Sequence, residues 1–421
     1  MTASPTPESR VPSPGFSAID HAMMARALRL AGRGLYSTQP NPRVGCVLAH
    51  DGEIVGEGWH QCAGEPHAEV FALRAAGERA QGATAYVTLE PCAHYGRTPP
   101  CADALIEAGV ARVIAACEDP NPKTAGAGLR RLREAGIGIA SGLMLDAARE
   151  LNRGFLSRME RGRPWVRIKL AMSLDGRTAL ASGESKWITG EAARADVQRW
   201  RARSSAILTG AGTARADDPR LTVRLPDLGT LSSRERGWGE GSEELKRSNT
   251  SEPSPGASRH PLPEGEGKSF VPPLRVVLDP RLDALRVDAH LLDGSAPTLV
   301  LHAPDAQPFD GRYAQTELAA VETGSDARLD LHEVMRVLAQ RQVNELQVEA
   351  GPRLCGALFG AGLVDELLLY VAPVLLGDAA RPLLALPPLQ SIAQRHALRV
   401  IDRRRVGEDW RWLLRPAGGN A

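Results

Sequence analysis

The sequence predicts two α/β domains. A chain of 421 residues, at roughly 100 to 200 residues per domain, is long enough for two or three globular units with apolar cores. Along it, short apolar runs alternate with helical patterns of about 10 to 15 residues, which is typical of α/β layers with a largely parallel sheet. Pro164 separates one such series from the next. We therefore expect one domain over 16–163 and a second over 164–421.

The first series begins with a helix. Apolar residues recur at helical spacing over 19–30, Ser17 is a suitable N-cap, and Gly32 and Gly34 stop the pattern. The elements that follow are strands at 44–50 and 52–60, a helix at 65–77, a strand at 83–92, a helix at 101–110, a strand at 111–119, and a helix and strand within 128–142. Residues 145–164 are expected to bridge to the second domain.

The second series shows the same succession of strands, loops and helices. Its apolar runs lie at 165–179, 204–219, 273–280, 296–304 and 344–373. Between them, from about 228 to 272, aliphatic residues are few and Gly, Pro, Ser and charged residues are many. Such a segment cannot bury enough apolar area to offset its ordering entropy, so we predict a disordered insertion inside the second domain. The Pro- and Ser-rich residues 1–15 predict a disordered tail.

Composition excludes several classes of function. The 51 Lys and Arg residues nearly balance the 50 Asp and Glu residues, and aromatic residues are only 4%, so we expect no nucleic-acid partner. No apolar stretch approaches the roughly 20 residues of a membrane span, so we expect no membrane partner. Six cysteines are too few for a disulfide scaffold, and the N-terminus lacks the pattern of a signal peptide. We expect a cytoplasmic protein with reduced thiols.

Four residues carry the pattern of a catalytic zinc site. His67 lies at a predicted helix start, Cys92 closes a predicted strand, and Cys101 follows after eight intervening residues. One imidazole and two thiolates leave the fourth position of a tetrahedral zinc open for water, as in catalytic rather than structural sites. Glu69, two residues beyond His67, can move a proton of that water. This is the signature of zinc-dependent nucleoside and nucleobase deaminases, so we predict one zinc ion per chain.

Two other interpretations use the same residues. A deaminase of nucleosides or tRNA with an unrelated C-terminal domain is disfavoured by the neutral charge and by the spacing of Cys92 and Cys101, because the general pattern is Cys-x-x-Cys. A structural zinc domain joined to a nucleotide sensor needs a fourth protein ligand, and Cys62 is the only spare candidate nearby in the sequence. Cys62 does not match the motif, and we interpret it as an incidental thiol.

Longer motifs resemble one known family. The runs PNPRVGCVL, GWHQCAGEPHAEV, TLEPCAHYGRTPPC and DPNPKTAGAG are similar to the deaminase half of the bifunctional riboflavin-biosynthesis deaminase/reductases, where the longer cysteine spacing is usual. In the second half, RIKLAMSLDGRTA, SGESKWITG, AILTGAGTARADDPRLTVR and VEAGPRLCGALFGAGLVDELLLYVAP resemble the reductase domain of that family. The resemblance covers nearly the whole chain apart from the tail and the insertion. It implies a cytidine-deaminase-like three-layer domain followed by a dihydrofolate-reductase-like domain.

The resemblance also implies a substrate and its contacts in the first domain. A diaminopyrimidinone that carries a phosphorylated ribosylamino group is deaminated hydrolytically at the zinc site, and NADPH then reduces the ribosyl chain to ribityl in the second domain. The loop residues expected to bind this phosphorylated pyrimidine beside the zinc are Asn41, His94, Arg97, Asn121 and Lys123. Asn41 and Asn121 each lie in a Pro-Asn-Pro sequence, so a turn role is equally open for both.

In the second domain, two glycine turns replace the usual dinucleotide fingerprint, because no GxGxxG follows a strand. Gly210 to Thr213 end one predicted strand, and Gly351 ends another, with Pro352 ready for the first turn of a helix. Backbone N–H groups at that helix start suit the pyrophosphate of the cofactor. The residues that resemble the NADPH contacts of the family are Ala171, Trp187, Thr213, Asp217, Gly351, Pro352, Arg353, Leu354, Cys355, Gly356 and Ala357.

The resemblance implies a second set of substrate contacts. Its members are Ser185, Arg201, Leu221, Arg224 and Glu349, to which we add Lys169. The two arginines suit a ribose phosphate because a guanidinium fork matches its oxygens, although Arg201 on its helical pattern is also typical of a surface. Lys169 and Asp175 lie beside the expected hydride site and could polarise or protonate the sugar. Pro280 stands where a small polar residue is expected, which removes one cofactor hydrogen bond. We also expect a homo-oligomer.

Overall fold

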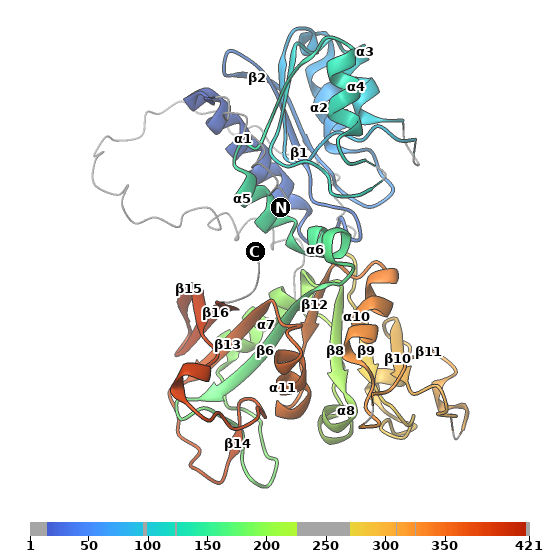
Figure 1. The fold of residues 1–421 in the computed structure, drawn as a ribbon, viewed down its shortest axis with the longest axis vertical. Helices are drawn as coiled ribbons and strands as arrows, with labels where there is room; N and C mark the ends of the chain where they lie inside the picture. The colour runs from blue at the N-terminus through green and yellow to red at the C-terminus, as the bar shows by residue number, and fades with distance from the viewer. Residues whose placement is uncertain are drawn as a thin grey trace, which may run out of the picture. The chain divides into compact units, whose positions relative to one another are not determined.

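The computed structural model describes residues 15–95, 99–122, 124–224, 270–308, 310–324 and 326–417. The chain forms two compact units, Met1–Glu160 and Arg161–Ala421, which are coloured blue to green and green to red in Figure 1. The predicted tail at 1–15 and insertion at 228–272 lie outside the described residues, apart from Gly15 and residues 270–272. None of the helices in the described ranges is long and apolar enough to cross a membrane.

The first unit is built on a five-stranded sheet. Its strands, in spatial order, are β2 (Glu53–Trp59), β1 (Gly45–His50), β3 (Thr84–Val87), β4 (Arg112–Ala115) and β5 (Gly138–Ser141). β3, β4 and β5 are parallel, but β1 is antiparallel to both β2 and β3. The expectation of a largely parallel sheet is therefore wrong for this unit. A tight turn at Asp51 and Gly52, both at positive φ, joins β1 and β2 as a hairpin. A parallel pair would need a crossover connection, and the chain between these two strands is too short for one.

Helices cover both faces of this sheet, which gives the expected three layers (Figure 1). The helices are α1 (Ala18–Ala31), α5 (Leu145–Leu151) and α6 (Arg153–Arg161) on one face, and α2 (Ala68–Ala76), α3 (Cys101–Glu107) and α4 (Ala127–Glu134) on the other. Residues 145–164, expected as a bridge, instead form α5 and α6. Phe155 and Leu156 are buried in the core of the first unit, so these helices belong to it.

The second unit is built on a nine-stranded sheet. The strands, in spatial order, are β11 (Glu317–Ala320), β10 (Thr298–His302), β9 (Leu274–Leu278), β8 (Ala206–Gly210), β12 (Glu345–Val348), β6 (Trp165–Ser173), β13 (Glu366–Ala372), β16 (Asp409–Pro416) and β15 (Leu398–Val406). Neighbours from β11 to β13 are parallel, and the last two pairings are antiparallel. A separate ribbon pairs β7 (Arg177–Ala179) with β14 (Arg381–Pro382).

The two faces of the larger sheet differ in chemistry. α10 (Leu331–Gln340) and α11 (Pro352–Gly360) pack on an apolar face. α7 (Glu191–Ala202) covers a face that holds buried ions, and α8 (Ala211–Asp217) follows β8. Under α7, the fully buried Arg167 donates to Glu345 and Glu366 at 2.9 and 2.7 Å, and its guanidinium lies 4.5 Å from the ring of Trp200. This network ties α7, and with it Arg201, to the central strands.

Candidate functional site

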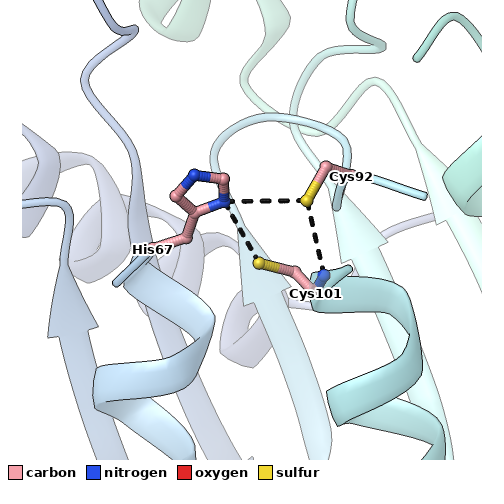
Figure 2. Close-up of side chains that lie close together, drawn as sticks. All are labelled: His67, Cys92 and Cys101. Carbon is pink, nitrogen blue, oxygen red and sulfur yellow. Dashed lines mark hydrogen bonds between the residues drawn. The ribbon is translucent and has the colours of Figure 1, made fainter. Parts of the chain in front are cut away.

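The first candidate site gathers His67, Cys92 and Cys101 at the ends of three elements. His67 is the N-cap of α2, Cys92 lies in the loop after β3, and Cys101 is the first residue of α3. Figure 2 shows the imidazole and both sulfur atoms converging on one point. The Nδ1 atom of His67 lies 3.2 Å from Cys101 Sγ and 3.6 Å from Cys92 Sγ. The predicted constellation is therefore assembled without rearrangement of the chain.

The ligand atoms suit a zinc ion. One nitrogen and two sulfur atoms all lie within 4.8 Å of one another, and within the part of the chain that the structure describes the cluster has these three members. Cys62 is not among them, so the three-ligand pattern of a catalytic zinc fits better than a closed structural site. The pKa of the Cys92 thiol is lowered to about 4, because Cys101 and His67 hydrogen bond to its thiolate. A thiolate is the form that binds zinc.

Glu69 lies in the first turn of α2 and is buried beside the cluster. Burial raises the pKa of its carboxyl to about 7, while the nearby His67 acts in the opposite direction. Its Oε2 atom is buried without a hydrogen-bond partner among the described residues. An orphaned buried carboxylate oxygen is costly in free energy, so the position is expected to serve a ligand or a proton. The role of Glu69 as a proton carrier stays a prediction.

His60, which the sequence analysis did not single out, orders the neighbourhood of Asn41. Its Nδ1 atom lies 3.1 Å from the carbonyl oxygen of Pro66, so this nitrogen must carry the proton. Burial lowers the pKa of His60, so its ring is neutral and Nε2 is an acceptor. Nε2 accepts from the amide nitrogen of Asn41 at 3.1 Å, which leaves the Asn41 carbonyl oxygen for another partner. The His60 ring also packs edge-on against His67, with centroids 5.4 Å apart.

Glu90, in the TLEPC motif, organises the loop that leads to α4. Its buried carboxylate accepts four backbone N–H groups, from Asp119, Gly126, Gly128 and Leu129, at 2.9 to 3.2 Å. These donors bracket residues 120–125. The sequence analysis missed Glu90, although a charged residue between an apolar strand and a metal ligand was the available signal. Gly128 is required there, because a Cβ would lie 1.8 Å from the carbonyl oxygen of Pro91.

Two of the predicted substrate contacts of the first unit, Asn121 and His94, lie in or beside this loop. Asn121 takes part in a turn, since its N–H donates to Asp119 and its carbonyl accepts from Thr124. His94 is exposed, with Nδ1 3.4 Å from the hydroxyl of Thr124. The predictions for Arg97 and Lys123 fall on positions outside the described residues.

The second candidate site lies at the C-terminal end of β12, beside the middle of β6. Ile168 pairs with Val348, which brings Lys169 and Glu349 together as neighbours on adjacent strands. Arg201 of α7 donates Nε and Nη2 to the two Glu349 carboxylate oxygens, both at 2.7 Å. Although burial favours the protonated form, Arg201 and Lys169 hold the pKa of Glu349 at about 2. Burial also lowers the pKa of Lys169.

This geometry refines the predicted role of Arg201. The side chain also donates Nη1 to the carbonyl of Thr222, so much of its donor capacity is used within the protein. Arg201 therefore fits the role of an ion-pair partner that fixes Glu349 better than that of a residue free to bind a phosphate. Arg224 is exposed near this pair, and its backbone N–H donates to Gln198. Leu221 is buried at φ 49 on the same segment.

The two glycine turns of the cofactor prediction contact each other. The backbone N–H of Gly351 donates to the hydroxyl of Thr213 at 3.1 Å, which joins the end of β12 to the start of α8. Gly351 is the N-cap of α11 and Pro352 occupies its first turn. A Cβ on Gly212 would meet no atom within 4 Å, so there is room above this turn. The first turn of α11 contains the predicted residues Pro352, Arg353 and Leu354.

Other predicted contacts lie around these turns in varied environments. Ala171 is half-buried on β6, and Asp217 is exposed at the end of α8. Cys355 and Gly356 are buried inside α11 rather than facing solvent. Trp187 is 69% exposed beside Ser185, and the guanidinium of Arg194 lies 4.6 Å from its ring.

Asp175 does not meet the expectation of a proton donor. Its carboxylate accepts from the hydroxyl of Ser173 and from the backbone N–H groups of Leu376 and Gly377. These hydrogen bonds, that of Ser173 above all, lower its pKa. A carboxylate engaged in this way anchors the turn after β6 to the loop after β13, and Lys169 is the better placed of the two candidates.

Family models match both units. Residues 17–117 match the cytidine and deoxycytidylate deaminase zinc-binding region, and residues 164–411 match the RibD C-terminal domain. The first match contains the whole histidine and cysteine cluster, and the second contains Lys169, Arg201 and Glu349.

Similar proteins span nearly the whole chain. The riboflavin biosynthesis protein RibD of Escherichia coli K12 is 48% identical over 400 residues, which cover 93% of this chain and 97% of that protein. RibD of Bacillus amyloliquefaciens is 39% identical over 397 residues, 94% and 96% of the two chains. A solved structure of Acinetobacter baumannii RibD is 42% identical, with a TM-score of 0.79 over 95% of this chain and 99% of that one.

Proposed function

This chain belongs to the RibD family of riboflavin-biosynthesis enzymes, and we propose which of its residues carry each of the family's two reactions. It is a bifunctional enzyme with a zinc-dependent deaminase domain and a dihydrofolate-reductase-like reductase domain. The first removes the amino group of the phosphoribosylamino-diaminopyrimidinone by hydrolysis. The second reduces the ribosyl chain to ribityl with NADPH. The residue assignments below rest on the two site geometries.

His67, Cys92 and Cys101 are the residues that would hold the zinc ion. The observation that carries this assignment is their convergence, with three ligand atoms within 4.8 Å and none supplied by Cys62. When bound, zinc activates a water molecule as the nucleophile for the amino-bearing ring carbon. Glu69 accepts a proton from that water and delivers a proton to the departing ammonia, for which its orphaned Oε2 is available.

The substrate of the first reaction is oriented by residues around the cluster. Asn41, whose amide nitrogen is held by His60, presents its carbonyl oxygen as an acceptor for an exocyclic amino group or ring N–H. His94, Arg97, Asn121 and Lys123 are assigned to the ribose phosphate. This division follows the chemistry of the groups, because cations and N–H donors match a dianion and a carbonyl oxygen does not.

In the reductase domain, Lys169, Arg201 and Glu349 form the substrate end. When bound, NADPH supplies a hydride to the sugar carbon. Lys169 then donates a proton or hydrogen bond to the sugar oxygen on which charge develops, a role favoured by its lowered pKa. Glu349, kept ionised by Arg201, orients the Lys169 ammonium and accepts from sugar hydroxyls. Ser185, Leu221 and Arg224 complete the proposed substrate contacts.

The remaining assigned residues hold NADPH. The N–H groups of the first turn of α11 and the hydroxyl of Thr213 lie where β12 and β8 end, which supports their assignment to the pyrophosphate. Ala171 on β6 and the exposed ring of Trp187 are assigned to the nicotinamide end. Asp217 and residues 353–357 complete the set carried over from the family.

We also propose that the enzyme is a cytoplasmic homo-oligomer. The described cysteines form no disulfide bond, which agrees with a reducing compartment. β15 has β16 on one side and no strand on its other side among the described residues, and it exposes Val400 and Ile401. An edge strand that exposes apolar side chains can serve as a template for pairing with a second copy, although the sequence LRVIDRRRV of β15 also carries five charged residues. A Val400→Lys variant should then lower the mass measured by light scattering, and an unchanged mass would rule out this edge.

The zinc assignment is tested by metal analysis together with ammonia release. Wild-type enzyme should hold one zinc ion per chain and release ammonia from the pyrimidine substrate. Cys101→Ala should lose both properties, whereas Cys62→Ala should retain both. Loss of zinc from the Cys62 variant would favour a four-ligand structural site instead.

A further inference from the structure

An arginine pair lies at the cofactor edge of the reductase domain and has no role in the assignments above. Arg215 of α8 and Arg281, which follows β9, both bind the carboxylate of Asp283. Arg215 Nη2 lies 2.9 Å from Oδ1, and Arg281 Nε lies 3.1 Å from Oδ2. Their side chains are 52% and 78% exposed, so each guanidinium keeps N–H groups that Asp283 does not occupy. Two guanidinium groups therefore share one half-exposed carboxylate, and both keep donors for a further anion.

The turn that carries Arg281 is held by hydrogen bonds to the buried side chain of Asp279. The fully buried carboxylate of Asp279 accepts the backbone N–H groups of Asp283 and Ala284 at 3.3 and 2.9 Å, and the hydroxyl of Tyr313 at 3.1 Å. A turn tied in this way keeps Arg281 and Asp283 in a defined place. The cluster is therefore a built feature of the sheet edge rather than a chance contact between two long side chains.

The order of the strands gives the direction of the cofactor. β6, β12, β8 and β9 are adjacent and parallel, so their C-terminal ends share one edge of the sheet. Glu349 follows the end of β12, level with Lys169 in the middle of β6. Beyond it along the edge lie the contact of Gly351 with Thr213 and then the arginine pair. At about 4.8 Å per strand, β9 lies roughly 14 Å from β6. A dinucleotide with its nicotinamide near β6 and its pyrophosphate at the glycine turns extends its adenosine over β8 and β9.

We propose that Arg215 and Arg281 bind the 2′-phosphate of NADPH and make the reductase select NADPH over NADH. The two cofactors differ only in this phosphate on the adenosine ribose, and guanidinium groups are the donors that match it. Pro280, next to Arg281, offers no side-chain donor, so the arginines supply the contacts in its place. Asp283 holds the two side chains together, and the two cations outweigh its repulsion of the phosphate. The inference rests on the cofactor placement proposed above.

The test compares ligands with and without the 2′-phosphate by calorimetry on the full chain. Wild-type enzyme should bind adenosine 2′,5′-bisphosphate and NADPH more tightly than ADP and NADH. In the Arg215→Ala, Arg281→Ala double variant, affinity for the two 2′-phosphorylated ligands should fall about ten- to hundredfold, and affinity for ADP and NADH should stay unchanged. The matched control is Arg341→Ala, which removes the ion pair with Glu317 at the opposite edge, where β11 begins. It should change none of these affinities.

Two outcomes separate this inference from the cofactor placement on which it rests. If the double variant keeps the wild-type preference for NADPH, the 2′-phosphate assignment is overturned. Gly351→Val probes the placement independently, because the glycine has an extended N-cap conformation that tolerates a side chain. It should weaken NADPH and NADH alike by crowding the pyrophosphate. If it changes neither affinity, the cofactor lies elsewhere and the arginine assignment fails with it.

Discussion

Two glutamates, the buried Glu69 of the deaminase domain and the largely buried Glu349 of the reductase domain, occupy opposite environments. Among the described residues, the Oε2 atom of Glu69 has no hydrogen-bond partner, and burial raises the pKa of its carboxyl to about 7. The carboxylate of Glu349 accepts from Nε and Nη2 of Arg201, and its pKa is held at about 2. The first arrangement suits a group that gains and loses a proton. The second suits a fixed negative charge that orients its neighbours.

The two sites also differ in how the chain builds them. The zinc ligands and Glu69 come from a single stretch, residues 67–101, at the ends of neighbouring elements. Lys169, Arg201 and Glu349 come from β6, α7 and the end of β12, and Arg201 and Glu349 are 148 residues apart in the chain. The comparison indicates that the proposed zinc site is built from a compact local motif, whereas the proposed substrate site of the reductase domain is assembled by strand order.

The largest effect is expected at Glu69. Glu69→Gln should lower the rate of deamination by roughly 100- to 10,000-fold, because the amide cannot accept the proton. Zinc content and the rate of NADPH-dependent reduction should stay at wild-type levels. Metal analysis and ammonia release measure the two properties on the same sample. Loss of zinc from a folded variant would show that Glu69 is a ligand.

The ion pair of Glu349 with Arg201 should instead make the free energy of unfolding depend on pH. Its folded pKa of about 2 lies below the ordinary value of 4.5, so ionised Glu349 stabilises the fold above pH 4.5. That contribution, roughly 3 kcal/mol, should be lost as the pH falls from 4.5 to about 2. The difference in free energy of unfolding between wild type and Glu349→Gln should shrink over this range. A difference independent of pH would contradict the assigned ion pair.

Arg201→Ala should separate the two activities. Reduction of purified deaminated intermediate should fall about ten- to hundredfold, because Glu349 loses its charge-assisted partner. Ammonia release should continue at a nearly normal rate. Arg201→Lys should restore little, since a single ammonium cannot reproduce the two parallel hydrogen bonds. NADPH absorbance follows the second step alone, and reduction at the wild-type rate while deamination collapses would reverse our domain assignment.

Glu90→Gln tests the loop that carries Asn121. An amide nitrogen cannot accept, so some of the four backbone donors lose their partner. We expect the KM for the pyrimidine to rise about tenfold with zinc content and kcat nearly unchanged. Glu57→Gln, which breaks the half-exposed pair with Arg26, is the matched control and should leave KM unchanged. Equal effects of both variants on KM would mean that Glu90 acts only on overall stability.

The smallest effect is expected from the predicted insertion. Replacing residues 230–269 with a short Gly/Ser linker should leave both activities and the melting temperature nearly unchanged, since the entropic cost of a loop grows slowly with its length. Steady-state assays of each step, with calorimetry, measure this. A large loss of reductase activity alone would assign the segment to the second site.

The sequence by itself determined the local features of this protein. Ser17 caps α1 as predicted, with its side chain accepting from Asp20, because a cap depends on residues only a few positions apart. The zinc ligands were equally readable, since their chemistry and order are nearly unique to one class of site. The glycine turn before Pro352 was found by the same local rules, and the family resemblance supplied the cofactor and substrate.

Only the tertiary structure determined which polar and charged residues, distant in the sequence, bind one another. Nothing in the spacing pairs Arg201 with Glu349, places Arg167 between Glu345 and Glu366, or gives Glu90 four backbone donors. The same residue types are typical of solvated surfaces, and burial changes both their pKa and their function. Likewise, residues 145–164 looked like a bridge because helical periodicity does not say which core receives the apolar face. These outcomes depend on strand order and packing, which arise from the whole chain rather than from any one segment.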